Sequence, residues 1–263
     1  MYAARPLDLS GAHRVNLVLL SEPELVDGAV ALEGERAEHL LDVLRVKVGD
    51  TVRVGVVDGD RGRGEVIAIE GRTVRLACVL DAPMLPEPRL DVLLALPRPK
   101  VLARLYSPLA QLGVARVLLT NAWRVERYYF DSHVLAPEAI REGLLEGLAQ
   151  AKDTRVPRVS VHRSLKFLLD RELAELVPEG TRLVVADPGA EVSLRDALAG
   201  APRALVAIGP EGGWTDRERR MLDERRFTRV GMGARTLRSD VATIALCSLA
   251  HDALGTPARD APG

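Results

Sequence analysis

The amino-acid sequence predicts an α/β protein in which a small β-rich module precedes a larger region of alternating strands and helices. Apolar and β-branched residues recur through residues 51–80, as in strands joined by hairpins. Three prolines between Ala82 and Arg89 are typical of an extended linker. After this linker, apolar runs of strand length alternate with runs of helical period. This alternation predicts a mostly parallel sheet covered by helices.

The N-terminal module is predicted to form a barrel-like sheet with one helix. Its helix places Ala37, Leu40 and Leu44 at the three-and-four spacing of one buried face. Turns that carry Asp58-Gly59-Asp60 and Glu70-Gly71 separate its later strands. The expected elements are a strand over Val15–Leu20, a helix over Gly34–Val46 and strands over residues 51–57, 64–69 and 73–80.

The larger region is expected to end with an apolar helix that stops at Gly255. Pro108 lies inside its first helix and is expected to kink that helix or shift its start. Thr215-Asp-Arg-Glu218 is a capping box, in which Thr215 accepts the amide of Glu218 while Glu218 reaches back. The expected strands cover residues 90–96, 114–120, 182–186 and 204–208, and the expected helices cover residues 100–112, 164–176 and 239–254, with another that begins at Pro137.

The composition argues against several classes of protein. No apolar run is long enough to span a bilayer and the N-terminus lacks an apolar signal core, so we expect a cytoplasmic protein that is not in a membrane. The two cysteines, Cys78 and Cys247, lie in apolar runs and are expected to be reduced thiols. The five histidines lack partners at metal-ligand spacings, so we expect no metal site.

Basic residues are concentrated in one segment although the formal net charge of the chain is only −1. The segment from Arg89 to Arg127 contains seven basic residues and two acidic ones, which gives it a local net charge of +5. Arginine forks onto phosphates and stacks on bases, which favours an RNA partner. The alternative is that arginine codons are common in a GC-rich genome, which would enrich arginine without any role in binding.

Two glycine-rich turns that follow predicted strands carry the candidate site. Leu205–Trp214 contains Gly-Pro-Glu-Gly-Gly, and Arg229–Arg238 contains Gly-Met-Gly. Neither turn has the fingerprint of a phosphate loop or of a dinucleotide site. Together with Ala186–Gly189, these turns are expected to meet at the carboxyl edge of the sheet, where open α/β sheets bind ligands.

Backbone groups at such turns suit an adenine edge and an amino-acid carboxylate, and S-adenosylmethionine presents both. The alternative reading is that glycines simply make tight turns. Glu211 lies between glycines, where we expect it to be buried, and Arg235 and Arg238 are expected to match its charge from the next turn. These charged residues favour a binding site.

The motifs resemble those of the RsmE-like ribosomal RNA uridine-N3 methyltransferases, which belong to the SPOUT superfamily. Ile208–Glu218 and Val230–Ala242 are similar to the two signature motifs of this family, in order and in spacing. Glu38–Arg45 is similar to its N-terminal PUA-like RNA-binding domain. The resemblance extends over about residues 14–255. Lys100 followed by Gln111–Val114, and Gln150 with Arg155–Pro157, fit the family in the stretch between these motifs.

The resemblance implies a fold, a cofactor and partners. It implies a PUA-like β-barrel followed by a SPOUT domain with a C-terminal trefoil knot, and a homodimer built around that knot. Bent S-adenosylmethionine would lie among the three loops, and N3 of a uridine in 16S (small-subunit) ribosomal RNA would be methylated. The expected domains are residues 1–82 with an N-terminal extension over 1–13, a linker over 83–89, the methyltransferase domain over 90–255 and a tail over 256–263.

The resemblance also assigns site residues. The residues expected to bind RNA are Arg45, Arg98, Lys100, Arg124 and Arg127. The residues expected to bind the cofactor are Asp187, Pro188, Ile208, Gly209, Pro210, Glu211, Gly212, Gly213, Met232, Gly233, Arg235 and Leu237.

The chemistry of uridine indicates which residues act in catalysis. N3–H is a weak imide acid, so its proton must be removed and the charge that spreads to O2 and O4 must be stabilised. Arg238 is the candidate for stabilising this charge, and Glu211 or Asp240 for taking or orienting the proton. The alternative for each of the three is an ion pair at a helix terminus.

The chain departs from the family pattern at several positions. Arg238–Ala242 reads Arg-Ser-Asp-Val-Ala where the family usually has Arg-x-Glu-Thr-Ala. Pro108 replaces a lysine of the family, and Gln111 replaces a glutamate. Asn121–Arg127 follows the corresponding family segment only loosely. These positions are expected at the RNA or the active site. Two other hypotheses therefore remain: a methyltransferase of the same fold that acts on another base or a ribose 2′-hydroxyl, and a non-catalytic RNA-binding relative.

Overall fold

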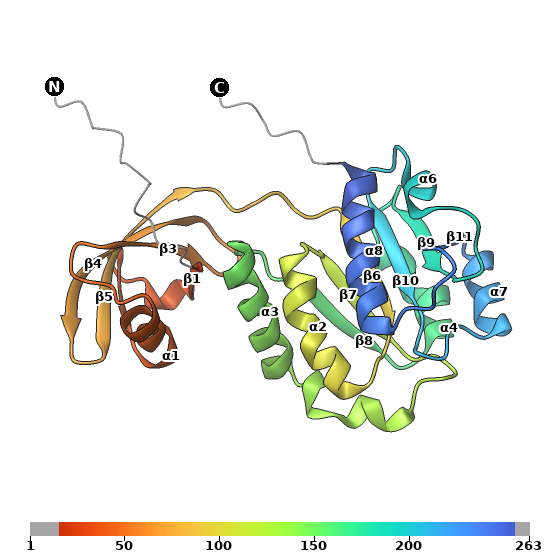
Figure 1. The fold of residues 1–263 in the computed structure, drawn as a ribbon, viewed down its shortest axis with the longest axis horizontal. Helices are drawn as coiled ribbons and strands as arrows, with labels where there is room; N and C mark the ends of the chain where they lie inside the picture. Colours follow the sequence, from red (N-terminus) through yellow and green to blue (C-terminus); the bar gives the residue numbers. More distant parts are fainter. Residues whose placement is uncertain (1–15, 256–263) are drawn as a thin grey trace. The chain divides into compact units, whose positions relative to one another are not determined.

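The computed structural model describes residues 16–255, which form two compact units. Within the described residues, the first unit comprises the chain up to Pro86 together with Leu148–Val156. The second comprises Glu87–Gly147 and the chain from Pro157 onward. Figure 1 shows the course of the chain through both units. The predicted N-terminal extension and C-terminal tail lie outside the described residues.

The first unit contains a five-stranded sheet in the order β1-β3-β4-β5-β2. β1 pairs with β3 in parallel, and the other three pairs are antiparallel. The pairing of β4 with β5 shifts register between Val66 and Ala68, an irregularity typical of a β-bulge that bends a strand. The strands are β1 (Val18–Leu20), β2 (Ala29–Leu32), β3 (Thr51–Val56), β4 (Arg61–Glu70) and β5 (Thr73–Ala82).

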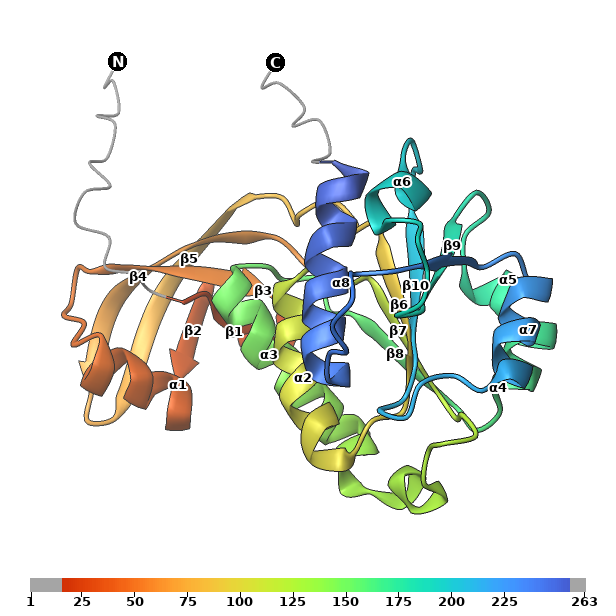
Figure 2. The same cartoon turned by 45° about the vertical axis from the view of Figure 1, so that its right-hand side comes forward.

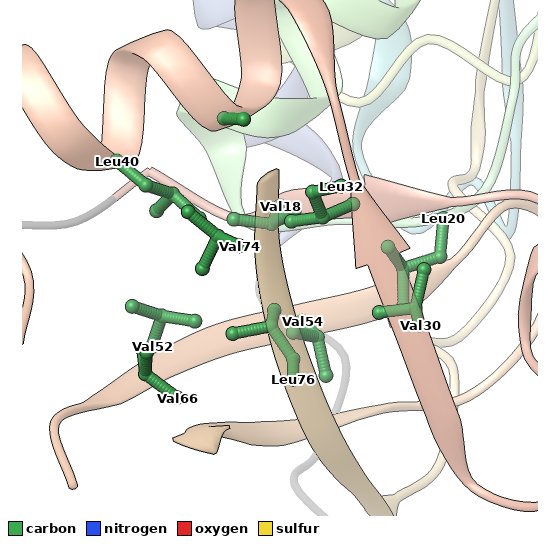
Figure 3. Packing of buried hydrophobic residues seen from close by; sticks show 11 residues of the cluster. Val18, Leu20, Val30, Leu32, Leu40, Val52, Val54, Val66, Val74 and Leu76 are labelled. Atoms are coloured by element: carbon green, nitrogen blue, oxygen red, sulfur yellow. The ribbon is translucent and has the colours of Figure 1, made fainter. Parts of the chain in front are cut away.

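Alternating residues of these strands form the core of the first unit, as Figure 3 shows. Val52, Val54, Val74 and Leu76 are buried, whereas the residues between them face solvent. The predicted helix is α1 (Gly34–Glu38), continued by a π-helical segment over His39–Val43. It is shorter than expected, and its buried residues are few: Ala37 and Leu40 are buried, while Leu41 and Leu44 are half-buried.

The second unit contains a six-stranded sheet in the order β11-β9-β10-β6-β7-β8, in which every pair of neighbouring strands is parallel. The predicted α/β fold is therefore confirmed. The two central strands, β6 and β10, are buried along their whole length, as expected of a sheet covered on both faces. The strands are β6 (Leu90–Ala95), β7 (Arg116–Thr120), β8 (Arg158–His162), β9 (Arg182–Ala186), β10 (Ala204–Ile208) and β11 (Thr228–Val230).

Helices cover both faces of this sheet. Figure 2 shows α2, α3 and α8 on one face and α4, α5 and α7 on the other. α2 runs through Pro108 and starts at Pro99, so the proline does not delay the start of the helix. The predicted helix over 164–176 consists of α4, a π-helical segment over Leu168–Glu172 and α5. The helices are α2 (Pro99–Gln111), α3 (Pro137–Ala151), α4 (Leu165–Phe167), α5 (Leu173–Leu176), α6 (Leu194–Leu198), α7 (Asp216–Glu224) and α8 (Ser239–Leu254).

A buried carboxylate lies at the amino-terminal edge of the six-stranded sheet. Asp91 in β6 is fully buried and accepts two hydrogen bonds of 2.8 Å from Arg203, which directly precedes β10. Arg116 at the start of β7 lies 3.4 Å from the same carboxylate. Strand register brings the three residues together, because Asp91 is paired with Leu205 on one side and with Arg116 on the other. This pairing stabilises a charge that would be costly to bury alone.

Candidate active site

The three predicted turns surround one cavity of about 400 Å³ at the carboxyl edge of the second sheet. The turns follow β9, β10 and β11, which are neighbours in the sheet. All twelve residues assigned to the cofactor by sequence line this cavity. It lies where parallel α/β sheets bind ligands, beyond the carboxyl ends of the strands. Of the other lining residues, Ala186, Trp214, Val230 and Thr236 belong to the predicted turns, whereas Arg124, Arg219, Ser239 and Ala242 lie outside them.

The turn after β10 depends on its glycines. Gly213 has a φ of +73°, a conformation that a side chain disfavours. A Cβ at Gly209 would lie 3.1 Å from Nε1 of Trp214, whose ring packs tightly against the turn. Trp214 is only 3% exposed, and its Nε1 has no hydrogen-bond partner in the protein. The cavity wall therefore contains a buried donor without a partner in the protein.

The turn after β11 packs directly on the turn after β9. The N–H of Gly231 donates to the carbonyl of Val192 at 2.9 Å, and that of Asp187 donates to Val230 at 2.9 Å. A Cβ at Gly231 would lie 2.1 Å from the carbonyl oxygen of Ala190, so only glycine permits this approach. The close backbone contact fixes the two walls of the cavity against each other.

The capping box of α7 is present as predicted. Thr215 Oγ1 accepts the N–H of Glu218 at 3.3 Å, and Glu218 Oε2 accepts the N–H of Thr215 at 2.8 Å. Glu218 is buried, and its other oxygen accepts the N–H of Trp123 at 2.7 Å. One carboxylate thus joins the first turn of α7 to the loop that follows β7.

The prediction that Glu211 is buried is wrong. Its side chain is exposed, and Oε1 accepts the N–H of Arg98 at 3.4 Å. The reason is local: Gly213 N–H donates to the carbonyl of Pro210 at 2.7 Å, so Glu211 lies at the corner of a tight turn and faces outward. Glu211 lines the cavity, but the described ion pairs do not link it with Arg235 or Arg238.

Arg238 pairs with Asp240 at the start of α8. Its Nε and Nη2 donate to the two carboxylate oxygens at 3.2 and 2.5 Å. Arg104 of α2 lies 3.8 Å from the same carboxylate. The hydrogen bond from Arg238 holds the pKa of Asp240 below its usual value. The Arg238 side chain is 71% exposed and neither residue lines the cavity, although Ser239 and Ala242 beside them do.

The residues assigned to RNA lie in both units. Arg45 belongs to the first unit, is exposed and has a φ of +53°. Arg98, Lys100, Arg124 and Arg127 are exposed in the second unit. Arg124 differs from the others because it lines the cavity and donates to the carbonyl of Gly212.

Residues 16–255 hold no group of three or more His, Cys, Asp or Glu side chains arranged for a metal ion. The helices in the same range are too short or too polar to cross a membrane.

Comparisons with known families identify both parts of the chain. A model described as an RNA methyltransferase domain matches residues 84–251. A model described as an RNA methyltransferase PUA domain matches residues 32–77.

Individual relatives agree with these matches. The protein from Treponema pallidum named ribosomal RNA small subunit methyltransferase E is 28% identical over 89% of this chain and 90% of its own length. A Borreliella burgdorferi protein named ribosomal RNA small subunit methyltransferase E 1 is 26% identical over 88% of this chain and 95% of its own length.

Solved structures share the fold. The ribosomal RNA small subunit methyltransferase E of Neisseria gonorrhoeae, bound to S-adenosyl methionine, has a TM-score of 0.71 at 19% identity, over 89% of this chain and 96% of its own. A putative methyltransferase of Legionella pneumophila with bound SAM has a TM-score of 0.70 at 19% identity, over 92% of this chain and 98% of its own.

Proposed function

The chain belongs to the RNA methyltransferase family whose domain matches residues 84–251, and on this premise we propose that it methylates N3 of a uridine in small-subunit ribosomal RNA with S-adenosylmethionine. The observation that carries the proposal is the cavity enclosed by the three strand-end turns. The names of the Treponema and Borreliella relatives support ribosomal RNA as the substrate. A ribosomal substrate also supports a cytoplasmic location.

The cavity fits S-adenosylmethionine in size and in chemistry. Its volume of about 400 Å³ lies within the usual range of small-molecule sites, about 300–1,000 Å³. Apolar side chains such as Met232 and Leu237 line it, and the N–H of Trp214 is a buried donor without a partner. We propose that the twelve predicted residues hold the cofactor, which supplies an electrophilic methyl group on its sulfonium.

Arg238 is proposed to stabilise the uracil as its N3 proton is lost. The negative charge then spreads onto O2 and O4, and a guanidinium stays charged at every accessible pH. Arg238 has five N–H donors and uses two of them on Asp240. The remaining donors and the high exposure of the side chain leave it free to meet the base at the rim of the cavity.

Glu211 and Asp240 are suited to different tasks. Because Arg238 lowers the pKa of Asp240, this carboxylate is a weak base and a poor acceptor for an imide proton. We assign Asp240 to holding Arg238 in position. Glu211 is exposed and lines the cavity, so it is the group proposed to take or orient the proton.

The proposal extends to the finer fold and to the assembly. We propose that the segment from β11 to α8 is part of a trefoil knot, which is supported by the close packing of Gly231 on Ala190. We also propose that the first unit is a PUA-like barrel that contacts RNA with Arg45. A homodimer is proposed because the outer face of α8 exposes Val241, Ile244 and Leu249.

Calorimetric titration with S-adenosylhomocysteine tests the proposed site. Ala242 lines the cavity from the first turn of α8 and is half-buried, so Ala242→Phe fills ligand space without disrupting the core. We expect wild type to bind and this variant to bind at least about ten-fold more weakly. Ala174→Phe, at an exposed position of α5, is the matched control and is expected to bind normally. A wild type that fails to bind contradicts the proposed function.

A further inference from the structure

Trp123 is the most exposed large hydrophobic residue among those described, at 81%. A tryptophan is usually highly buried, because its indole is the largest apolar side chain. The other tryptophan of the chain follows that rule, since Trp214 is only 3% exposed. The exposure of Trp123 therefore calls for a partner that covers the indole in the functional state.

The loop that carries Trp123 is fixed, so the exposure does not follow from a loose backbone. Ala122 and Val125 on either side are buried, and Val125 N–H donates to the carbonyl of Ala122 at 3.0 Å. The N–H of Trp123 itself donates to the buried carboxylate of Glu218 at 2.7 Å. The turn thus presents the indole outward on a rigid backbone.

The same loop forms part of the rim of the cavity. Arg124 lines the cavity, donates to the carbonyl of Gly212, and has its Cδ 2.7 Å from the position of a Cβ on Gly212. Trp123 does not line the cavity, so its indole lies outside the space proposed for the cofactor. Arg124 and Arg127 add two exposed positive charges to this loop.

The chemistry of the loop fits single-stranded RNA. Aromatic side chains beside arginines are the usual means of holding unpaired bases, because every base has a face for stacking and the arginines bind the phosphates. β6, β7 and β10 are neighbours in the sheet, so the loops after them share one edge. A uridine that enters the cavity at this edge brings its neighbours along the strand past the rim.

Resting on the proposed function, we infer that Trp123 stacks on a base that flanks the methylated uridine and so positions the RNA strand at the cavity. Trp123 is a positioning residue in this scheme, since it does not touch the reacting atoms. The stacked base would be recognised by its π-face and not by its hydrogen-bonding edge, so the contact sets RNA affinity more than sequence preference.

Intrinsic fluorescence tests the stacking directly, because the chain has only two tryptophans and one of them is buried. A short single-stranded RNA that contains uridine is titrated into wild type and into Trp123→Phe. Stacking predicts strong quenching in wild type that is lost in the variant. Inorganic polyphosphate is the matched probe with charge but without bases. Equal quenching by polyphosphate, or no quenching by RNA, overturns the inference.

Single-turnover methyl transfer separates this inference from its alternatives. We expect Trp123→Ala to raise the concentration of small-subunit RNA needed for half-maximal rate by about ten-fold, and Trp123→Phe to reverse most of this rise. The affinity for S-adenosylhomocysteine is expected to stay unchanged in both variants. Phe167→Ala, at an exposed aromatic of α4, is the control and is expected to have no effect. If Trp123→Ala converts the protein from dimer to monomer and leaves its RNA affinity unchanged, Trp123 forms a contact between copies of the chain. This result overturns the inference.

The two proposals fail in different ways. The fluorescence titration needs no cofactor, so quenching by RNA supports stacking even if wild type fails to bind S-adenosylhomocysteine. In that case the proposed function fails and the RNA contact stands. Normal cofactor binding and methyl transfer without quenching overturn the role of Trp123 alone.

Discussion

The side chain of Arg238 takes part in two interactions in this account: the ion pair with Asp240 and the proposed contact with the uracil oxygens. The ion pair is bidentate and lies at the end of an exposed side chain, where solvent screening leaves such pairs with little effect on stability. The guanidinium contributes far more free energy when it stabilises the negative charge of the base in the transition state. We therefore assign Arg238 mainly to chemistry and Asp240 to the orientation of its guanidinium.

Substitution of Arg238 tests this assignment. Arg238→Ala is expected to cost about 2–4 kcal/mol of transition-state stabilisation, as does the loss of one oxyanion donor elsewhere, while cofactor affinity stays within a few fold. Arg238→Lys is expected to recover only part of the rate, because an ammonium lacks the planar fork. Single-turnover rate, melting temperature and cofactor affinity are measured on the same three proteins. An alanine variant that melts early and loses the cofactor shows instead that Arg238 is a structural brace.

At the residue scale, the sequence located the cavity well because its lining comes from three local motifs. Glycine turns and the residues beside them are contiguous in the chain, so motif recognition found them together. Arg124 was not assigned to the cavity, since its contact with Gly212 joins residues far apart in sequence. The orientation of Glu211 was also missed, because it depends on the hydrogen bond between Gly213 and Pro210.

Among the elements, the pair α2 and α3 shows how closely two helices pack. A Cβ on Gly147 would lie 2.2 Å from the carbonyl oxygen of Ser107, and one on Gly143 would lie 2.8 Å from Cβ of Tyr106. The two glycines are four residues apart and so share one face of α3. They allow the backbones of the helices to approach directly. Tyr106 and Leu144 are buried in the packing around this face.

Gly147→Ala tests that packing. Alanine favours a helix by about 1 kcal/mol over glycine, but its methyl group would overlap a backbone carbonyl that cannot easily move, which costs about 1–3 kcal/mol. Because an overlap at 2.2 Å with a backbone oxygen falls at the upper end of that cost, we expect urea unfolding to show a net loss of about 1–2 kcal/mol for the variant. The neighbouring Glu146 is exposed, and Glu146→Ala is the control, expected to change stability by less than about 0.5 kcal/mol. Equal or higher stability of Gly147→Ala argues against close packing of the helices.

Elements that carry an apolar run or a clear helical period were predictable from sequence, and elements without such a pattern were missed. The strands β9 and β10 and the helix α8 have the predicted bounds, because apolar runs or helical periods mark them clearly. β2, β8 and α6 were missed. β8 is an edge strand without buried residues, so its sequence lacks an apolar run, and α6 has only five residues.

For the whole molecule, the order of the strands brings the site together. β9, β10 and β11 occupy one half of the sheet, whereas β6, β7 and β8 occupy the other, so β6 lies beside β10 although more than a hundred residues separate them. Sequence patterns predict which segments are strands but carry no information on this order. The resemblance to a family implied the knot and the dimer, which remain proposals, but it did not supply this order.

The proposed dimer is tested by charging the outer face of α8. Val241, Ile244 and Leu249 are 47%, 41% and 47% exposed on a helix whose other face is buried. We expect wild type to sediment as a dimer and Ile244→Lys as a monomer, because a lysine would be desolvated at the interface. Val79→Lys, at an exposed position of β5, controls for added charge and is expected to remain dimeric. A wild type that stays monomeric at every concentration contradicts the proposal.

The identity of the methylated nucleoside tests the central claim most directly. Small-subunit ribosomal RNA is incubated with the protein and S-adenosylmethionine that carries an isotope in its methyl group, then digested to nucleosides and analysed by mass spectrometry. The account predicts label in N3-methyluridine with wild type and a strongly reduced yield with Arg238→Ala. Label in a ribose 2′-O-methyl nucleoside or another base would show that the substrate is assigned wrongly, and the absence of label from every nucleoside would contradict the account as a whole.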